Sequence, residues 1–186
     1  MSLRLQQVLD ALDAFNREDP ASKELPYARQ LTDWVMRLNP NASEALRIAA
    51  RGQHVRRWTI PRSRYPMNRQ GYLRWRETLK TFHADTVAGV MRTAGYGDPE
   101  IERVRRLMSK RELGQDAETQ TLEDALCLVF LESQFTELRA KTPDEKMLEV
   151  LRKTWKKMSE AARAEAMRLP LGPAEQQLIK RALSNP

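Results

Sequence analysis

Four ionisable residues fall on predicted helix faces where apolar residues are expected to be buried. They are Glu24, His54, His83 and Glu132, and each lies on a different predicted helix. Burying an ionised group without a partner costs several kcal/mol, so each needs a counter-charge, a hydrogen bond or a metal. Two carboxylates and two imidazoles suit iron, manganese or zinc, and the same groups suit acid–base catalysis. We therefore predict that His54, His83 and Glu132 are catalytic, and that all four residues are candidate ligands of a divalent metal.

These residues also have a purely structural interpretation. A histidine on an apolar stripe is often a hydrogen-bonded core residue, and Glu24 and Glu132 could pair with arginines of the chain. Asp124 belongs to the tetrapeptide Thr-Leu-Glu-Asp at residues 121–124, which resembles a capping box. It is therefore predicted to cap a helix.

An arginine block surrounds His54. Eight arginines and no acidic residue lie between Arg51 and Arg76, whereas the whole chain carries a net charge of +7. Arginine without lysine favours bidentate recognition of phosphate or carboxylate, or pairing with the chain's own acids. The arginines are also expected to lower the pKa of His54 and keep it neutral. We predict an anionic small-molecule ligand, bound by Arg51, Gln53, Arg56, Arg57, Arg62, Arg64 and Tyr65.

Two other functions remain open at this point. The block is interleaved with four aromatic residues, a mixture that suits contact with an RNA backbone and stacking on bases, although no known RNA-binding signature is present. These residues are Trp58, Tyr65, Tyr72 and Trp75. The C-terminal third alternates charge along amphipathic helices, which is also typical of a structural or partner-binding protein. Its apolar stripe is more typical of a core than of an interface: Met147, Leu148, Leu151, Trp155 and Met158.

Nearly every segment has helical periodicity, and start signals such as Asp98-Pro99 and Thr142-Pro143 recur. The sequence predicts an all-α fold, a single domain over residues 1–186. The least regular stretch is residues 59–71, a loop long enough to favour a function. The predicted helices lie near 3–16, 23–38, 43–56, 71–95, 99–111, 121–140, 143–157, 159–168 and 173–184.

Composition bounds the class of protein further. The chain is 41% hydrophobic and 31% charged, as in ordinary globular proteins. No apolar run approaches the roughly 20 residues that span a bilayer, and the N-terminus lacks a cleavage site. The one cysteine, Cys127, lies in an apolar run and is predicted to be a core residue. We expect a cytoplasmic protein without membrane association, whose oligomeric state the sequence does not specify.

Several long motifs carry a resemblance. Residues 51–76, FHADTVAGV, TLEDALCLVFLESQF and KMLEVLRKTWKKMS resemble the domain-of-unknown-function family 4202, over almost the whole chain from about Glu24. The order of the candidate residues is also remotely similar to the HD superfamily, all-α metal-dependent phosphohydrolases. Gln53-His54 stands where that superfamily has His-Asp, Glu24 replaces its first histidine, and Glu132 is nearest its late acid. The resemblance implies an HD-like helical core and, with these departures, a divergent hydrolase acting on a phosphorylated or nucleotide-like molecule.

Overall fold

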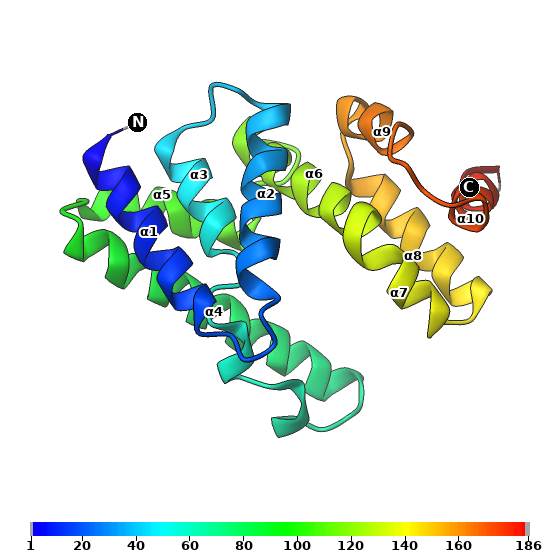
Figure 1. Cartoon of the computed structure of the whole chain (residues 1–186), viewed down its shortest axis with the longest axis horizontal. Helices are drawn as coiled ribbons and strands as arrows, with labels where there is room; N and C mark the ends of the chain where they lie inside the picture. Colours follow the sequence, from blue (N-terminus) through cyan, green and yellow to red (C-terminus); the bar gives the residue numbers. More distant parts are fainter. Residues whose placement is uncertain (1, 185–186) are drawn as a thin grey trace.

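The chain folds into helices, and no strand occurs within residues 2–184, the part that the computed structural model describes (Figure 1). The all-α prediction is therefore confirmed. The elements are α1 (Leu3–Arg17), α2 (Glu24–Leu38), α3 (Glu44–Gly52), η1 (Arg57–Thr59), η2 (Arg62–Arg64), α4 (Arg69–Thr93), α5 (Asp98–Ser109), α6 (Ala117–Val129), the π-helical turn η3 (Phe130–Gln134), α7 (Phe135–Ala140), α8 (Asp144–Lys157), α9 (Glu160–Ala166) and α10 (Pro173–Ser184).

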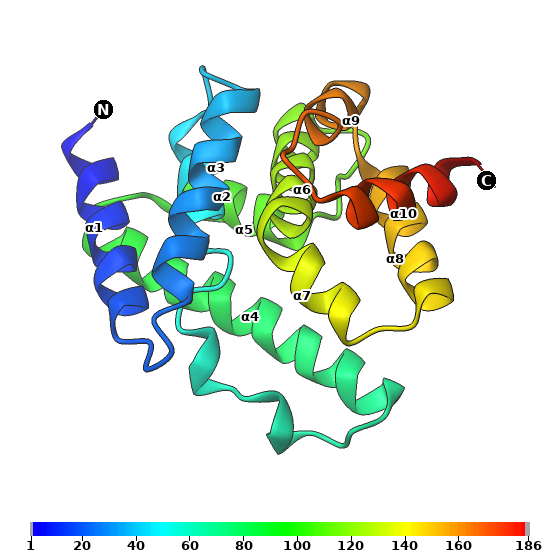
Figure 2. The same cartoon turned by 45° about the vertical axis from the view of Figure 1, so that its right-hand side comes forward.

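The helices bury one continuous cluster of apolar side chains that extends from α1 to α10. Helix α2 packs against α3 and α6, α3 packs against α5, and α4 crosses α5 (Figure 2). Helices α8 and α10 pair beside α6. In α8, Met147 and Leu151 are buried, and Trp155 packs against the same cluster. The prediction that the C-terminal stripe belongs to the core is confirmed.

Helix α6 begins earlier than the sequence predicts. Asp116 is its N-cap, and its carboxylate accepts the N–H of Thr119. The prediction that Asp124 is the cap is wrong: Asp124 lies buried within α6. Its carboxylate instead accepts the backbone N–H of Ser159, 2.8 Å away, at the start of α9. Residues 118–121 are all polar and separate the true cap, Asp116, from the apolar run. The capping pattern at residues 121–124 therefore predicted a start that is more than one turn too late.

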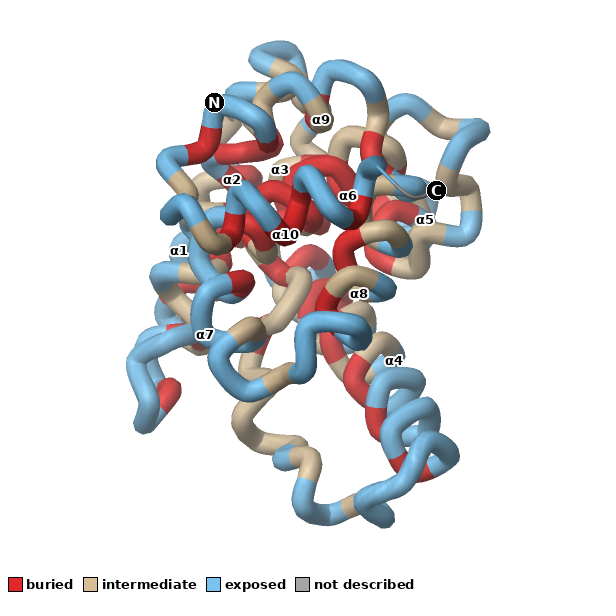
Figure 3. Tube along the Cα trace, turned by 90° about the vertical axis from the view of Figure 1, so that its right-hand side faces the viewer, coloured by how far each residue is buried: buried red, intermediate tan, exposed pale blue. Residues whose placement is uncertain are grey.

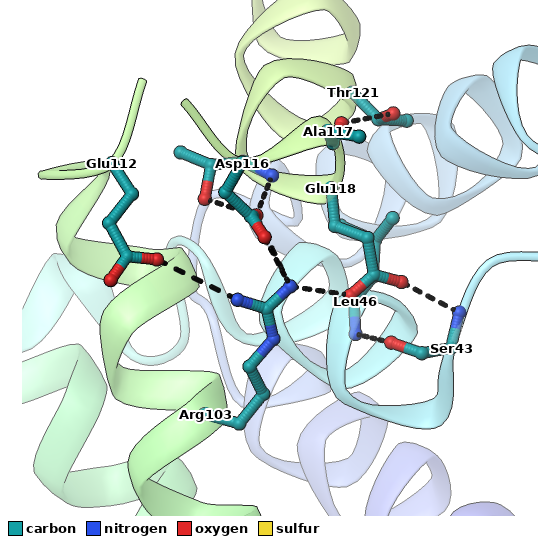
Figure 4. A network of polar contacts seen from close by, with 9 residues as sticks. Ser43, Leu46, Arg103, Glu112, Asp116, Ala117, Glu118 and Thr121 are labelled. Carbon is teal, nitrogen blue, oxygen red and sulfur yellow. Dashed lines mark hydrogen bonds and ion pairs between the residues drawn. The ribbon is translucent and has the colours of Figure 1, made fainter. Parts of the chain in front are cut away.

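Arg103 ties three helices together (Figure 4). Its guanidinium, on α5, donates to Asp116 and Glu118 at the start of α6, with N···O distances of 2.9 and 2.8 Å. Glu118 in turn accepts the backbone N–H of Ser43, the N-cap of α3, at 3.0 Å. The starts of α3 and α6 therefore meet the middle of α5 at one charged network.

Residues 61–76, hereafter the arm, extend away from the rest of the molecule and are mostly exposed (Figure 3). They comprise η2, the following loop and the first turns of α4. Arg62 holds the loop by donating to the carbonyl oxygens of Tyr65, Pro66 and Asn68. Gly71 lies against Pro66, whose carbonyl oxygen would be 2.1 Å from an added Cβ. The predicted irregular loop thus has a defined conformation.

Within residues 2–184, no helix combines the length and the apolar composition that crossing a membrane requires.

Candidate functional site

A cavity of about 670 Å³ lies where α4 faces the turn after α3, the end of α5, and α6. Its volume is within the range of small-molecule sites. Four of the predicted site residues line it: Gln53, His54, Arg57 and His83. The same wall of α4 adds Arg76 and Lys80, and the opposite side includes Lys110, Glu123, Cys127, Phe130, Thr154 and Lys157.

His54 is held by three neighbours. Its Nε2 lies 2.9 Å from a guanidinium nitrogen of Arg57. Because a guanidinium can only donate, Nε2 is the acceptor and the ring proton is on Nδ1. That nitrogen faces a carboxylate oxygen of Glu24 at 3.6 Å. The phenol ring of Tyr27 stacks on the imidazole at 4.2 Å, with planes 7° apart.

Burial holds the pKa of His54 well below its usual value, and the charges of Arg57, Lys110 and Arg76 lower it further. Burial also raises the pKa of the Glu24 carboxyl. His54 is therefore a neutral imidazole whose acceptor nitrogen is already used by Arg57. It orients that guanidinium rather than offering a free lone pair.

His83 has the free lone pair. Its Nδ1 lies 2.9 Å from the carbonyl oxygen of Val55, which can only accept, so Nδ1 carries the proton. Nε2 is buried and has no hydrogen-bond partner among the described residues, although the ring lines the cavity. Burial, the neighbouring His54 and then Arg57 lower the pKa of His83 to about 4. At neutral pH, Nε2 is an unoccupied acceptor.

Gly52 brings the two histidines together. A Cβ at Gly52 would lie 2.3 Å from Cγ2 of Val87, one turn along α4 from His83. The imidazoles are consequently only 6.1 Å apart between ring centroids. The predicted helix over 43–56 ends at Gly52, and Arg56 adopts a left-handed φ of 54°. His54 thus belongs to a turn, in which Gln53 and Val55 donate to carbonyls three residues earlier, and not to the helical row of Leu46 and Ala50.

The cavity is basic mainly on the α4 side. Across the cavity, Glu123 contacts Lys110 and Lys157 at 3.1 and 3.0 Å. Burial alone would raise the pKa of Glu123, but the two ammonium groups hold it below its usual value. Those charges are largely compensated, whereas Arg57 and Arg76 face the cavity without an ion pair to any described residue. An anion would therefore be attracted to the wall formed by η1 and α4.

The predicted anion-binding residues have different fates. Arg51 is committed to the fold: its guanidinium contacts Asp13 at 2.7 Å and donates to Thr32. Arg56 contacts Glu18 at 3.4 Å. Arg62 and Arg64 donate to backbone carbonyls and do not line the cavity. The half-buried Tyr65 also lies outside the lining.

Glu132 lies elsewhere. It accepts the indole N–H of Trp34 at 2.6 Å and the amide of Gln30 at 2.8 Å, and the residue is exposed. The π-turn explains the difference, since Phe135 donates to Phe130 five residues earlier and shifts the helical register. The prediction of a buried Glu132 is wrong. Glu132 therefore anchors α2 to the junction of α6 and α7.

The four predicted metal ligands are not gathered at one point. Over residues 2–184, no group of three or more His, Cys, Asp or Glu side chains is arranged to hold a metal ion. Glu24 and His54 meet, and His83 lies beside them, but the lone pair of His54 is directed at Arg57. These residues do not fit a resident metal, and the metal remains a prediction.

Several cavity residues were absent from the sequence-based prediction. Lys80 could have been included, because it precedes His83 by three residues and shares its helical face. Tyr27 similarly lies three residues after Glu24. Lys110 and Lys157 come from remote segments, and no local pattern indicates that they meet at Glu123. Cys127, predicted to be a core residue, is buried and also lines the cavity.

The fold and cavity define an all-helical protein with a basic cavity that contains a neutral histidine pair. The chain belongs to the family described as Domain of unknown function (DUF4202), whose profile matches residues 6–179. Comparisons with curated proteins and with solved structures each found no match.

Proposed function

We propose that the cavity binds a small phosphorylated molecule, or a similar anion, and that His83 transfers a proton in its reaction. The observation that carries this proposal is the buried, unpartnered Nε2 of His83, a residue that lines the cavity together with Arg57 and Arg76. Leaving a buried acceptor without a hydrogen bond costs about 1–3 kcal/mol, so a ligand that donates a hydrogen bond to Nε2 recovers that free energy.

The ligand must also supply donors as well as negative charge. The Oε1 atom of Gln53 is a second buried acceptor without a partner, and Gln53 lines the same cavity. A phosphate ester with nearby hydroxyl groups, or with a water molecule beside it, satisfies both requirements. The guanidinium groups would hold the phosphate oxygens, and His54 would keep Arg57 in place.

Proton transfer follows from the electrostatics of this arrangement. Burial, the neighbouring His54 and Arg57 keep the pKa of His83 at about 4, too low for an efficient base at neutral pH. A bound phosphate dianion favours the imidazolium and raises that pKa. In the proposed phosphoester hydrolysis, water attacks phosphorus and gives a proton to Nε2, and the P–O bond to the leaving group breaks. The leaving alcohol takes its proton from solvent, while the arginines stabilise charge on the phosphoryl oxygens.

The test uses His83→Asn, because the asparagine amide can keep the hydrogen bond to Val55 while Nε2 is removed. We expect inorganic phosphate to bind wild type and variant alike by calorimetry. The hydrolysis of p-nitrophenyl phosphate by the variant should fall by about 100-fold or more. Arg92→Gln, on the far part of the same helix, is the matched control. An unchanged rate in His83→Asn, or no phosphate binding by wild type, would contradict the proposal.

A metal-dependent version of this function requires ligands beyond the two histidines. Elemental analysis of the purified protein, beside His54→Ala, tests it directly. Near-stoichiometric iron, manganese or zinc that is lost in the variant would support the metal-dependent mechanism. Absence of these metals from both samples, even after reconstitution, would contradict it.

A further inference from the structure

The arm concentrates arginines that make no ion pair with a described carboxylate. Arg51 and Arg56, which precede the arm, pair with acids of α1 and of the turn after it. Several exposed arginines elsewhere contact carboxylates, as Arg4 does with Glu100 and Arg181 with Asp144, whereas Arg17, Arg106 and Arg111 pair with no described carboxylate. None of the five arm arginines lies within ion-pair range of a described carboxylate: Arg62, Arg64, Arg69, Arg74 and Arg76. The arm is therefore a region of uncompensated positive charge.

The arm also exposes apolar and aromatic surface. Met67 is 81% exposed, Leu73 is 55% exposed and Tyr72 is 43% exposed, all within seven residues. The guanidinium of Arg76 lies 5.9 Å from the centre of the Tyr72 ring and donates to its hydroxyl. An exposed aromatic ring among arginines offers stacking and charge at the same place.

A stack of side chains connects this surface to the cavity. Arg57 lies over Trp75 at 4.9 Å, and Trp75 is 6.0 Å from Tyr72 between ring centroids. Trp75 is buried and donates its indole N–H to the carbonyl of Ile60, which fixes the base of the arm. Since Arg57 and Arg76 both line the cavity, the positive surface of the arm continues into it.

From this placement we infer that the arm binds the backbone of a single-stranded nucleic acid, with Arg69 and Arg74 on phosphates and Tyr72 against a base. Guanidinium groups without internal partners match a regularly repeating phosphate, and a half-exposed tyrosine matches an unstacked base. An acidic membrane would also attract the arginines. The exposed tyrosine, whose ring can stack on a base, and the continuity of the arm with the basic cavity favour the polynucleotide. This binding is independent of the chemistry proposed for His83.

The test measures anisotropy of a fluorescein-labelled 20-nucleotide oligouridine with the full chain across a potassium chloride series. The arm variant is Arg69→Ser with Arg74→Ser. Its matched control, with the same net charge, is Arg168→Ser with Arg181→Ser, two exposed arginines far from the arm. We expect about tenfold or greater weakening in the arm variant only. The slope of log K against log salt should fall by about 0.7 for each phosphate that the variant no longer binds.

Two further comparisons separate the alternatives. Tyr72→Ala should weaken binding at least about fivefold and Tyr72→Phe should retain it, because the ring supplies the stacking. Equal binding of oligothymidine would assign recognition to the shared backbone, and preference for oligouridine would assign it to RNA. Equal losses in the arm and control variants would overturn the inference, as would binding to phosphatidylserine vesicles without binding to either oligonucleotide. His83→Asn should leave oligonucleotide binding intact, and the arm variant should still bind inorganic phosphate.

Discussion

At the residue scale, the two histidines, both predicted to be catalytic, differ in whether their acceptor nitrogen is free. His54, in the arginine block, gives its acceptor nitrogen to Arg57, whereas His83, on an apolar stripe of α4, keeps a free one. The sequence correctly predicted a neutral His54. It could not show which nitrogen is occupied, because Val55 and Arg57 reach the rings only through the turn after α3. His83 therefore has both properties: its Nδ1 makes the hydrogen bond expected of a core histidine, and its Nε2 is a free acceptor.

The lowered pKa of His83 predicts how stability depends on pH. The folded value, about 4, lies below the usual 6.5, so the unfolded chain takes up the proton first as pH falls. The free energy of unfolding should therefore be highest above pH 6.5 and decrease towards pH 4. Between pH 7 and pH 5 the loss due to His83 should be about 2 kcal/mol.

Urea unfolding of wild type and His83→Asn at these two pH values measures this effect. The variant should lose less stability between them, because its side chain does not titrate. His54, whose pKa is lowered too, is present in both proteins, so the difference between them reports on His83 and on its coupling to His54. Identical pH dependence in the two proteins would mean that His83 is not buried as a neutral ring.

At the element scale, the close approach of α3 to α4 depends on one glycine. We expect Gly52→Ala to lower the free energy of unfolding by about 1–3 kcal/mol, because its Cβ would overlap the branched Val87. Gly89→Ala is the control, since nothing lies within 4 Å of its added Cβ. It should stabilise α4 by about 0.5–1 kcal/mol. Chemical denaturation of the two variants, and of Gly52→Ala combined with Val87→Ala, measures these free energies. If the double variant is no more stable than Gly52→Ala alone, the loss does not come from a clash with Val87.

Most elements could be predicted from local patterns, since apolar periodicity and the start signals at Asp98-Pro99 and Thr142-Pro143 mark real helices. Two local departures could not. The helix predicted to include His54 stops at Gly52, and the helix predicted over 121–140 contains a π-turn. Both involve local backbone hydrogen bonds, to the third residue back after Gly52 and to the fifth residue back at Phe135, which a single helical period does not encode. These two departures determine where His54 and Glu132 lie.

At the scale of the whole molecule, long-range ion pairs decide which charges remain for a ligand. The sequence places Arg51 and Arg57 in one block, yet only the folded chain assigns Arg51 to Asp13 and leaves Arg57 at the cavity. Similarly, Lys110 and Lys157 are brought to Glu123 from segments far apart. The overall class of fold was therefore predictable, whereas much of the candidate site was not.

The Arg103 network should matter more for stability than exposed ion pairs. Arg103→Ala removes the shared partner of Asp116 and Glu118, and we expect a loss of about 1–3 kcal/mol, moderated because the group is partly exposed. Arg181→Ala breaks an exposed pair and should cost about 1 kcal/mol or less. Thermal or chemical denaturation compares them. Equal losses would show that the junction of α3, α5 and α6 does not depend on this guanidinium.

Helix α4 is a single unbroken rod that carries the arm at one end and His83 further along. At a rise of 1.5 Å per residue, Arg69 and His83 are separated by about 20 Å along its axis. Because a continuous helix does not shorten, this separation is fixed. Helix α4 would then act as a molecular ruler: a strand that contacts Arg69 and presents an end to His83 must span about 20 Å, and shorter strands would reach only one of the two.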